Sequence, residues 1–247
     1  MNKIKGFLKR KDIEFSLKRY GIDALGAMAQ GLFASLLVGT ILSTIGQQFS
    51  IDSLVEIGNF ASAVKGSAMA IAIGYALKAP PLVLFSLAAV GYSADIEGGA
   101  GGPLAVFFMS IIAAELGKAI SKETKLDILI TPVVTIISGC ALSMLCAKYI
   151  GMFASSFGNA VMWATELHPL LMGVIVSAVI GIALTLPISS AAICAALGLT
   201  GLAGGAAVAG CCAQMVGFAV LSFHENRWGG LVSQGLGTSM LQMGNIV

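Results

Sequence analysis

Ionisable side chains are rare in the apolar stretches of this chain, and the few found there are the first candidates for chemistry. Lys65 lies in the apolar stretch 57–79 with no acidic residue at helical spacing, whereas Glu115 and Lys118 stand three residues apart on one helix face. Charges inside apolar segments are costly and mark functional sites. We expect Lys65 to bind an anionic or hydroxyl-bearing solute or to pair with a carboxylate from another span. Glu115 and Lys118 either pair with each other or contact solute.

Two glycine-rich segments could offer backbone groups to a ligand. The first, residues 95–103, combines two carboxylates with a run of glycines and reads as a loop, and the second, residues 201–205, repeats the glycines. Glycine allows close backbone approach and positive φ, and free N–H and C=O groups at helix breaks bind solute in transporters. The alternative is that glycine only lets helices pack closely. The candidates selected here are Asp95, Glu97, Gly98, Gly99, Gly204 and Gly205.

Uncharged and mixed polar residues near the C-terminus form a third set. The turn His224-Glu225-Asn226 can donate and accept hydrogen bonds densely, as recognition of a sugar requires, although an ordinary cytoplasmic turn has the same composition. Glutamines in apolar surroundings need partners and suit a polar path between helices. The candidates selected here are Gln214, His224, Glu225, Asn226, Gln234 and Thr238.

Motifs of enzymes and metal proteins are missing from the sequence. It contains no G-x-S-x-G, H-E-x-x-H or Walker A pattern, and its five cysteines form no C-x-x-C pair. We predict no catalytic residue, no metal and no cofactor in this chain. A membrane enzyme stays open as a class, but no nucleophile–base pair is visible.

Composition sets the class of protein that must position these residues. Hydrophobic residues make up 57% of the 247 residues and charged residues only 11%, whereas soluble domains are roughly 25% charged. Too few charges remain to cover a surface in water, so lipid is the solvent. Strands with alternating polarity, as in a membrane barrel, are not seen. The sequence predicts an all-α, polytopic membrane protein with about eight spans.

The spans are predicted to form two parallel repeats, at about 21–125 and 126–227, followed by a partial segment 228–247. Pro80 and Pro187 open short segments that end in glycines, which favours re-entrant or broken helices there. Four crossings per repeat make the repeats parallel rather than inverted. Apolar spans are expected at 21–45, 57–79, 80–94, 104–120, 126–150, 169–186, 187–200 and 206–223.

The N-terminal segment 1–20 is basic and amphipathic. It holds seven of the 14 basic residues and runs directly into the first span. Positive charge beside a span indicates the cytoplasmic side, and such a segment also suits the surface of an anionic bilayer. We expect a cytoplasmic N-terminus, Asp52 and Glu97 outside and Lys122 inside. Nucleic-acid binding is not expected.

Two longer motifs carry a family resemblance. The tail reads SFHENRWGGL at 222–231 and QGLGTSMLQ at 234–242, and KAPP at 78–81 is followed by DIEGGAGGP at 95–103. Together they resemble the membrane-embedded EIIC component of the bacterial phosphotransferase system, in the branch that includes perfringolysin-regulator-like proteins. The resemblance implies a dimeric sugar carrier in the bacterial cytoplasmic membrane, served by soluble phosphocarrier A and B proteins. In the family a glutamate and a histidine of loop regions bind sugar, which points to Glu97 and to His224-Glu225.

The sequence departs from the family pattern near its end. It stops at Val247, where the family continues with further helices, and Gly244 stands where proline is expected. We expect either a shortened member or one that completes its bundle by oligomerising. Two functions therefore stay open: a carrier for a small polar solute, or a membrane sensor that binds a ligand without moving it.

Overall fold

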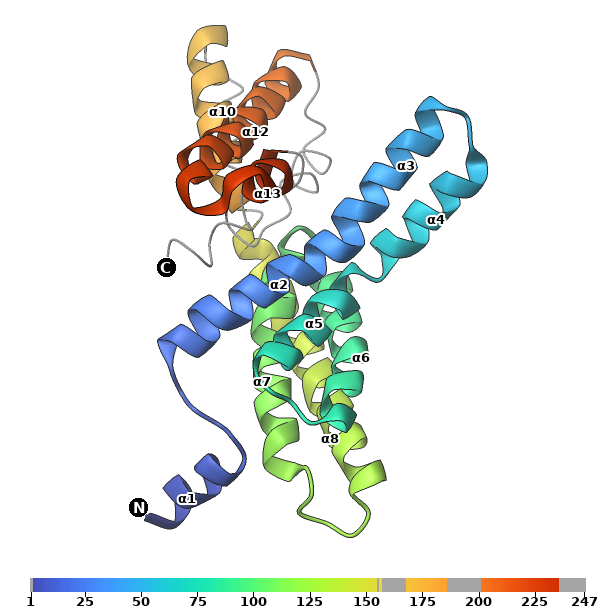
Figure 1. Ribbon diagram of the computed structural model, residues 1–247, viewed down its shortest axis with the longest axis vertical. Coiled ribbons are helices and arrows are strands. Elements are labelled where there is room, and N and C mark those ends of the chain that lie inside the picture. Colours follow the sequence, from blue (N-terminus) through green and yellow to red (C-terminus); the bar gives the residue numbers. More distant parts are fainter. Residues whose placement is uncertain (1, 155, 157–167, 186–200, 236–247) are drawn as a thin grey trace.

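The computed structural model describes residues 2–154, 156, 168–185 and 201–235. Every regular element in these ranges is a helix, which confirms the predicted class (Figure 1). Four helices within them are long and apolar enough to cross a membrane: Lys18–Gln48, Gly102–Ile120, Asp127–Ala154 and Gly201–Leu221. The predicted count of eight spans stays a prediction, and segment 187–200 lies outside the described residues.

The chain begins with α1 (Asn2–Arg10), and residues 11–17, here called the strap, lead into one long helix. That helix comprises η1 (Lys18–Asp23), α2 (Ala24–Leu32), η2 (Phe33–Leu37) and α3 (Val38–Gln48). Its 31 residues span about 46 Å, more than the hydrocarbon core of a bilayer. The π-helical segments η1 and η2 mark places where the regular hydrogen-bond ladder is widened.

The predicted span 57–79 is not one helix, which corrects that expectation. α4 (Asp52–Ala63) packs back along α3, and at Val64 (φ −97°, ψ 13°) the chain departs from helical geometry before α5 (Lys65–Ala76). Figure 1 shows the α3–α4 hairpin extending away from the bundle, whereas α5 lies against α2 and α6. The two halves therefore bury different faces against different partners, and the break at Val64 lets each half do so.

The centre of the fold is formed by α5, α6 (Pro81–Gly98), α7 (Gly102–Ile120) and α8 (Asp127–Leu142). Pro81 stands at the first position of α6, where its missing N–H costs nothing. α6 is an unbroken helix of 18 residues, so the first of the two predicted short broken segments, 80–94, is corrected. Its buried side chains and those of its neighbours form one core, which includes Met69, Ile73, Leu77, Leu87, Val90, Val106 and Met109.

The second half of the chain begins, like the first, with a long helix that contains a π-helical segment. α8 continues through η4 (Ser143–Ala147) to Ala154, so both long helices contain a π-helical segment part-way along. α10 (Pro169–Thr185) and α12 (Gly201–Leu221) follow, and α13 (Phe223–Gly235) packs on α12. The order agrees with the predicted repeat, which remains a prediction. Gly204 and Gly205, expected in a loop, lie instead within α12, in its first two turns.

Candidate functional site

Lys65 and Asp95 form an ion pair between two helices of the bundle. Lys65 is the first residue of α5, and its Nζ donates a hydrogen bond to Asp95 Oδ2 in the last turn of α6. The Asp95 side chain is 9% exposed and that of Lys65 is 30% exposed. Of the two sequence-based alternatives for Lys65, the structure shows the carboxylate from another helix. Asp95 was expected in an outer loop, so its burial at a helix end is a correction.

Glycines hold this pair in place because they let three helices approach closely. A Cβ on Gly66 would lie 2.5 Å from the Gly91 carbonyl oxygen and 2.6 Å from Asp95 Cβ. A Cβ on Gly102, at the start of α7, would lie 2.8 Å from the Asp95 carbonyl oxygen. Any larger residue would push α5 or α7 away from α6. Gly66, Gly91 and Gly102 therefore serve close packing of helices, the alternative role given to glycine in the sequence analysis.

The turn between α6 and α7 is tighter than the predicted loop 95–103. Residues up to Gly98 belong to α6, and η3 (Gly99–Gly101) leads directly into α7. Gly98 is buried, and a Cβ at this position would lie only 2.8 Å from Ala105 Cβ, which is too close. A Cβ on Gly99, in contrast, would meet nothing within 4 Å. Gly99 has φ +50°, so glycine is required there by conformation rather than by space. Glu97 is exposed beside this turn.

Departures from regular helix gather around the ion pair. η2 packs against α4 and α5 on either side of Val64, and η4 packs against α6 and α7 near the turn at η3. Such segments leave backbone groups outside the regular ladder and are frequent at functional sites. We call Lys65, Asp95 and the four surrounding irregular segments (η2, Val64, η3 and η4) the Lys65–Asp95 layer.

The remaining sequence-predicted residues that the structure describes belong to α12 and α13, which pack on each other, and α12 also packs on α10. His224 Nδ1 lies 3.6 Å from Glu225 Oε1, and both side chains are largely exposed. Gln234 is 2% exposed and its Nε2 donates to Ser222 Oγ at 3.1 Å. Gln214 is half-buried where α12 faces α10, and Asn226 follows in the first turn of α13. Thr238 lies outside the described residues.

Gly205 differs from Gly66, Gly91 and Gly102, which pack closely against neighbouring helices. A Cβ on Gly205 would meet nothing within 4 Å, so space does not require glycine there. Close approach of α10 and α12 depends instead on Gly181 and Gly210, since a Cβ on Gly210 would lie 2.7 Å from the Ser177 carbonyl carbon. The structure thus places the predicted site residues in two groups, one on α5–α7 and one on α12–α13.

A buried polar cluster near the N-terminus was only partly foreseen. The predicted Glu115–Lys118 pair is present, with Lys118 Nζ 3.1 Å from Glu115 Oε2. Lys118 also donates to the carbonyl oxygens of Asp12 (2.7 Å) and Leu77 (3.0 Å), and Arg19 donates to the same Leu77 oxygen at 2.7 Å. These contacts fasten the strap to the end of α5. They join residues far apart in sequence, so spacing alone gives no signal for them.

A family comparison accounts for most of the chain. The family described as phosphotransferase system, EIIC, matches residues 22–247. The chain belongs to this EIIC family. No curated protein and no solved structure matches it significantly. Members of the EIIC family are membrane-embedded sugar-transport components, so the resemblance seen in the sequence is confirmed at this level. The match begins at residue 22, within η1, so α1 and the strap lie before the matched range.

Proposed function

We propose that this EIIC component carries a sugar or sugar derivative across the bacterial cytoplasmic membrane and binds it in the Lys65–Asp95 layer. The observation that carries the proposal is the ion pair between Lys65 and Asp95, which joins two helices of an apolar bundle. A lysine in a membrane-spanning segment costs about 2.5–3.5 kcal/mol on insertion scales, so its presence there indicates a function. In an EIIC component we expect that function to be recognition of the solute.

The chemistry of the pair suits a polyhydroxylated solute. A carboxylate accepts hydrogen bonds from two neighbouring hydroxyl groups, and an ammonium group donates to hydroxyl oxygens. The Lys65 side chain is 30% exposed, so a solute can reach it from outside the core. Lys65 can then replace its hydrogen bond to Asp95 with one to a solute oxygen. Exposed Glu97 and the turn at Gly98 and Gly99 lie beside the pair. In the binding step, the hydrogen bond between Lys65 and Asp95 is therefore replaced by hydrogen bonds from the two side chains to the solute.

The second group of polar residues is proposed to complete the solute path. His224, Glu225 and Asn226 offer donors and acceptors on α13, and Gln214 and Gln234 lie along α12 and α13. If the two halves are parallel repeats, the segment at Gly204 and Gly205 is equivalent to the turn at Gly98 and Gly99. Such equivalent segments meet around the solute in repeat-built transporters. Thr238 is included in this path on its sequence alone.

Orientation and partners follow from charge and from the family. The basic segment before the first span supports a cytoplasmic N-terminus, which we include in the proposal. Soluble phosphocarrier A and B proteins would then meet the cytoplasmic side, where they supply the phosphoryl group for the incoming sugar. Because many side chains on the outer faces of the bundle are large and apolar, such as Phe85 and Ile128, we propose that lipid covers part of this surface and a second copy another part. The working unit is proposed to be a homodimer.

Transport in proteoliposomes tests the function. The reconstituted parent protein is preloaded with unlabelled sugar and offered radiolabelled glucose, galactose, mannitol or N-acetylglucosamine in a counterflow assay. We expect accumulation of at least one sugar by the parent and by Lys125→Met, at an exposed lysine of the α7–α8 loop, but not by Lys65→Met. Saturable binding of a sugar without counterflow would instead indicate a sensor. Counterflow by Lys65→Met at the parent rate would remove Lys65 from the solute site.

A further inference from the structure

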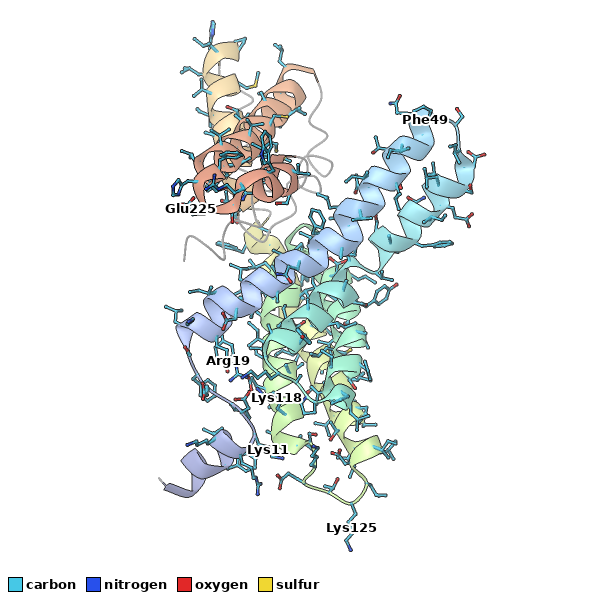
Figure 2. All side chains as sticks on the ribbon, in the orientation of Figure 1. Lys11, Arg19, Phe49, Lys118, Lys125 and Glu225 are labelled. Atoms are coloured by element: carbon cyan, nitrogen blue, oxygen red, sulfur yellow. The ribbon has the colours of Figure 1, made fainter. Side chains whose placement is uncertain are left out.

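A basic cleft lies where the strap meets the bundle, and the family match does not cover its N-terminal wall. The cleft has a volume of about 420 Å³ and forms between the end of α1, the α5–α6 corner and the loop after α7. Figure 2 shows Lys11, Arg19 and Lys118 on this side of the bundle, and Lys125 at the tip of the α7–α8 loop, away from it. Its lining residues are Arg10, Lys11, Asp12, Lys78, Pro80, Lys118, Ser121, Lys122 and Glu123.

The charges of the cleft do not balance. Its lining contains five cationic side chains and two carboxylates. Both carboxylates are engaged: Arg19 donates to Asp12 at 2.8 Å, and Glu123 receives Arg10 at 2.7 Å and Lys11 at 2.6 Å. Hydrogen bonds from these cations hold the pKa of Asp12 and of Glu123 below their usual values. Both carboxylates therefore stay ionised and occupied at neutral pH.

Two lysines of the lining make no direct ion pair, although Lys78 attracts Asp12 and Lys122 attracts Asp127 at longer range, and the Lys122 backbone N–H donates to Asp127 Oδ1 at 2.6 Å. Among the described residues, Lys78 and Lys122 have no acidic oxygen within 4 Å of their Nζ atoms, whereas Lys118 is paired with Glu115. Both lysines are exposed toward water. Like charges near one another in a cleft raise the local concentration of anions.

Helix ends do not account for these two lysines. Three helices finish at the cleft, and lysine often stabilises the free carbonyl groups of a helix C-terminus. Here other residues do that: Lys118 and Arg19 bond the Leu77 carbonyl, and Lys11 bonds the Ser121 carbonyl. The positive φ of Lys78 (+55°) and Lys122 (+62°) belongs to the turns that end α5 and α7, where Ala79 N–H bonds the Gly74 carbonyl and Glu123 N–H bonds the Ile120 carbonyl. The backbone at both lysines is therefore explained by these turns, and their side chains remain available to a ligand.

We propose that this cleft binds a phosphate group, held by Lys78 and Lys122 with Arg10 at its rim. Lysine binds phosphate as a point charge, and two unpaired lysines match the charge of a phosphate monoester. The group could belong to a soluble phosphate ester or to an anionic lipid headgroup, because α1 is basic and the strap beside it exposes Phe15 and Leu17. Both sources present the same oxygens to the cleft.

Binding to the full-length protein in zwitterionic nanodiscs separates these sources. The probes are inorganic phosphate, glycerol 3-phosphate and dioctanoyl phosphatidylglycerol, each titrated calorimetrically. The test variant is Lys78→Gln/Lys122→Gln, and the matched control is Lys125→Gln, which neutralises an exposed lysine of the same loop outside the cleft. We expect saturable binding that the double variant weakens at least about tenfold and the control leaves unchanged.

Each outcome decides the proposal. Binding of glycerol 3-phosphate or phosphate identifies a soluble ester as the ligand class, and binding of the phosphatidylglycerol probe alone identifies a lipid headgroup. Failure of all three probes to saturate, or equal weakening by Lys125→Gln, overturns the site. If the double variant does not fold, Arg10→Gln, at a side chain 64% exposed, replaces it and should weaken the same binding by about threefold. An Arg10→Gln variant that binds like the parent then overturns the proposal.

Discussion

Removing the buried lysine of α7 should destabilise the protein strongly and release the strap. The Lys118 side chain is 1% exposed, and its Nζ contacts the carbonyl oxygens of Asp12 and Leu77 and the carboxylate of Glu115. In Lys118→Met, the Leu77 oxygen keeps its bond from Arg19, but the Glu115 carboxylate keeps only the Tyr20 hydroxyl at 3.1 Å. Breaking a buried pair from one side costs about 3–5 kcal/mol, because a buried charge is left uncompensated.

A second substitution separates the stranded charge from lost packing. In Lys118→Met/Glu115→Gln the carboxylate is gone, so we expect recovery of about 1–3 kcal/mol relative to Lys118→Met. Glu115→Gln alone should cost less, since Lys118 retains two carbonyl acceptors. The free energy of unfolding is measured by denaturant titration in mixed micelles, and strap release by limited proteolysis between residues 11 and 17. A free energy of unfolding of Lys118→Met within about 0.5 kcal/mol of the parent value would refute this reasoning. So would a double variant whose destabilisation equals the sum of the destabilisations of the two single variants.

Four further outcomes are expected. Gly99→Val should lower stability and sugar binding, because valine resists φ +50°, and binding equal to the parent would exclude a role for this turn. Gly205→Val should fold normally, since its Cβ meets nothing within 4 Å, but lose counterflow; retained counterflow would remove Gly205 from the solute path. Asp52→Cys should react with an impermeant thiol reagent in intact cells and Lys122→Cys only after permeabilisation, and the opposite pattern would reverse the topology. The strap should loosen on acidification. Hydrogen bonds from Lys11 and Arg10 lower the pKa of Glu123 from 4.5, so its ion pairs stabilise the strap above about pH 4.5 and are lost as pH falls through the lowered pKa. A rate of strap proteolysis that does not rise at any pH below 4.5 would contradict this.

Helix class and several helix limits could be predicted from composition and punctuation. The predicted span 104–120 is α7, at Gly102–Ile120, and the span 169–186 is α10, at Pro169–Thr185. Apolar runs bounded by proline, glycine or charged linkers determine such limits locally. The Glu115–Lys118 ion pair could also be predicted from the sequence, because its two residues are one helical turn apart.

What sequence could not supply is packing between distant segments. The break at Val64 has neither proline nor glycine beside it on its N-terminal side, and it arises because α5 must bring Gly66 against Gly91 of α6. Hydropathy records how apolar a stretch is, not the direction in which it runs. For the same reason the acidic, glycine-rich stretch 95–103 resembled a loop, although Asp95 is buried against a lysine 30 residues away.

The most direct test of the solute site is sugar binding by purified protein with the Asp95 carboxylate neutralised. Asp95→Asn keeps the shape of the side chain but removes the charge that Lys65 and the solute share, whereas Asp52→Asn makes the same change at an exposed helix start. Scintillation proximity with radiolabelled glucose, galactose, mannitol and N-acetylglucosamine measures the dissociation constant. The account predicts that a sugar bound by the parent and by Asp52→Asn binds at least about tenfold more weakly to folded Asp95→Asn. A folded Asp95→Asn protein that binds the same sugar as tightly as the parent would contradict it.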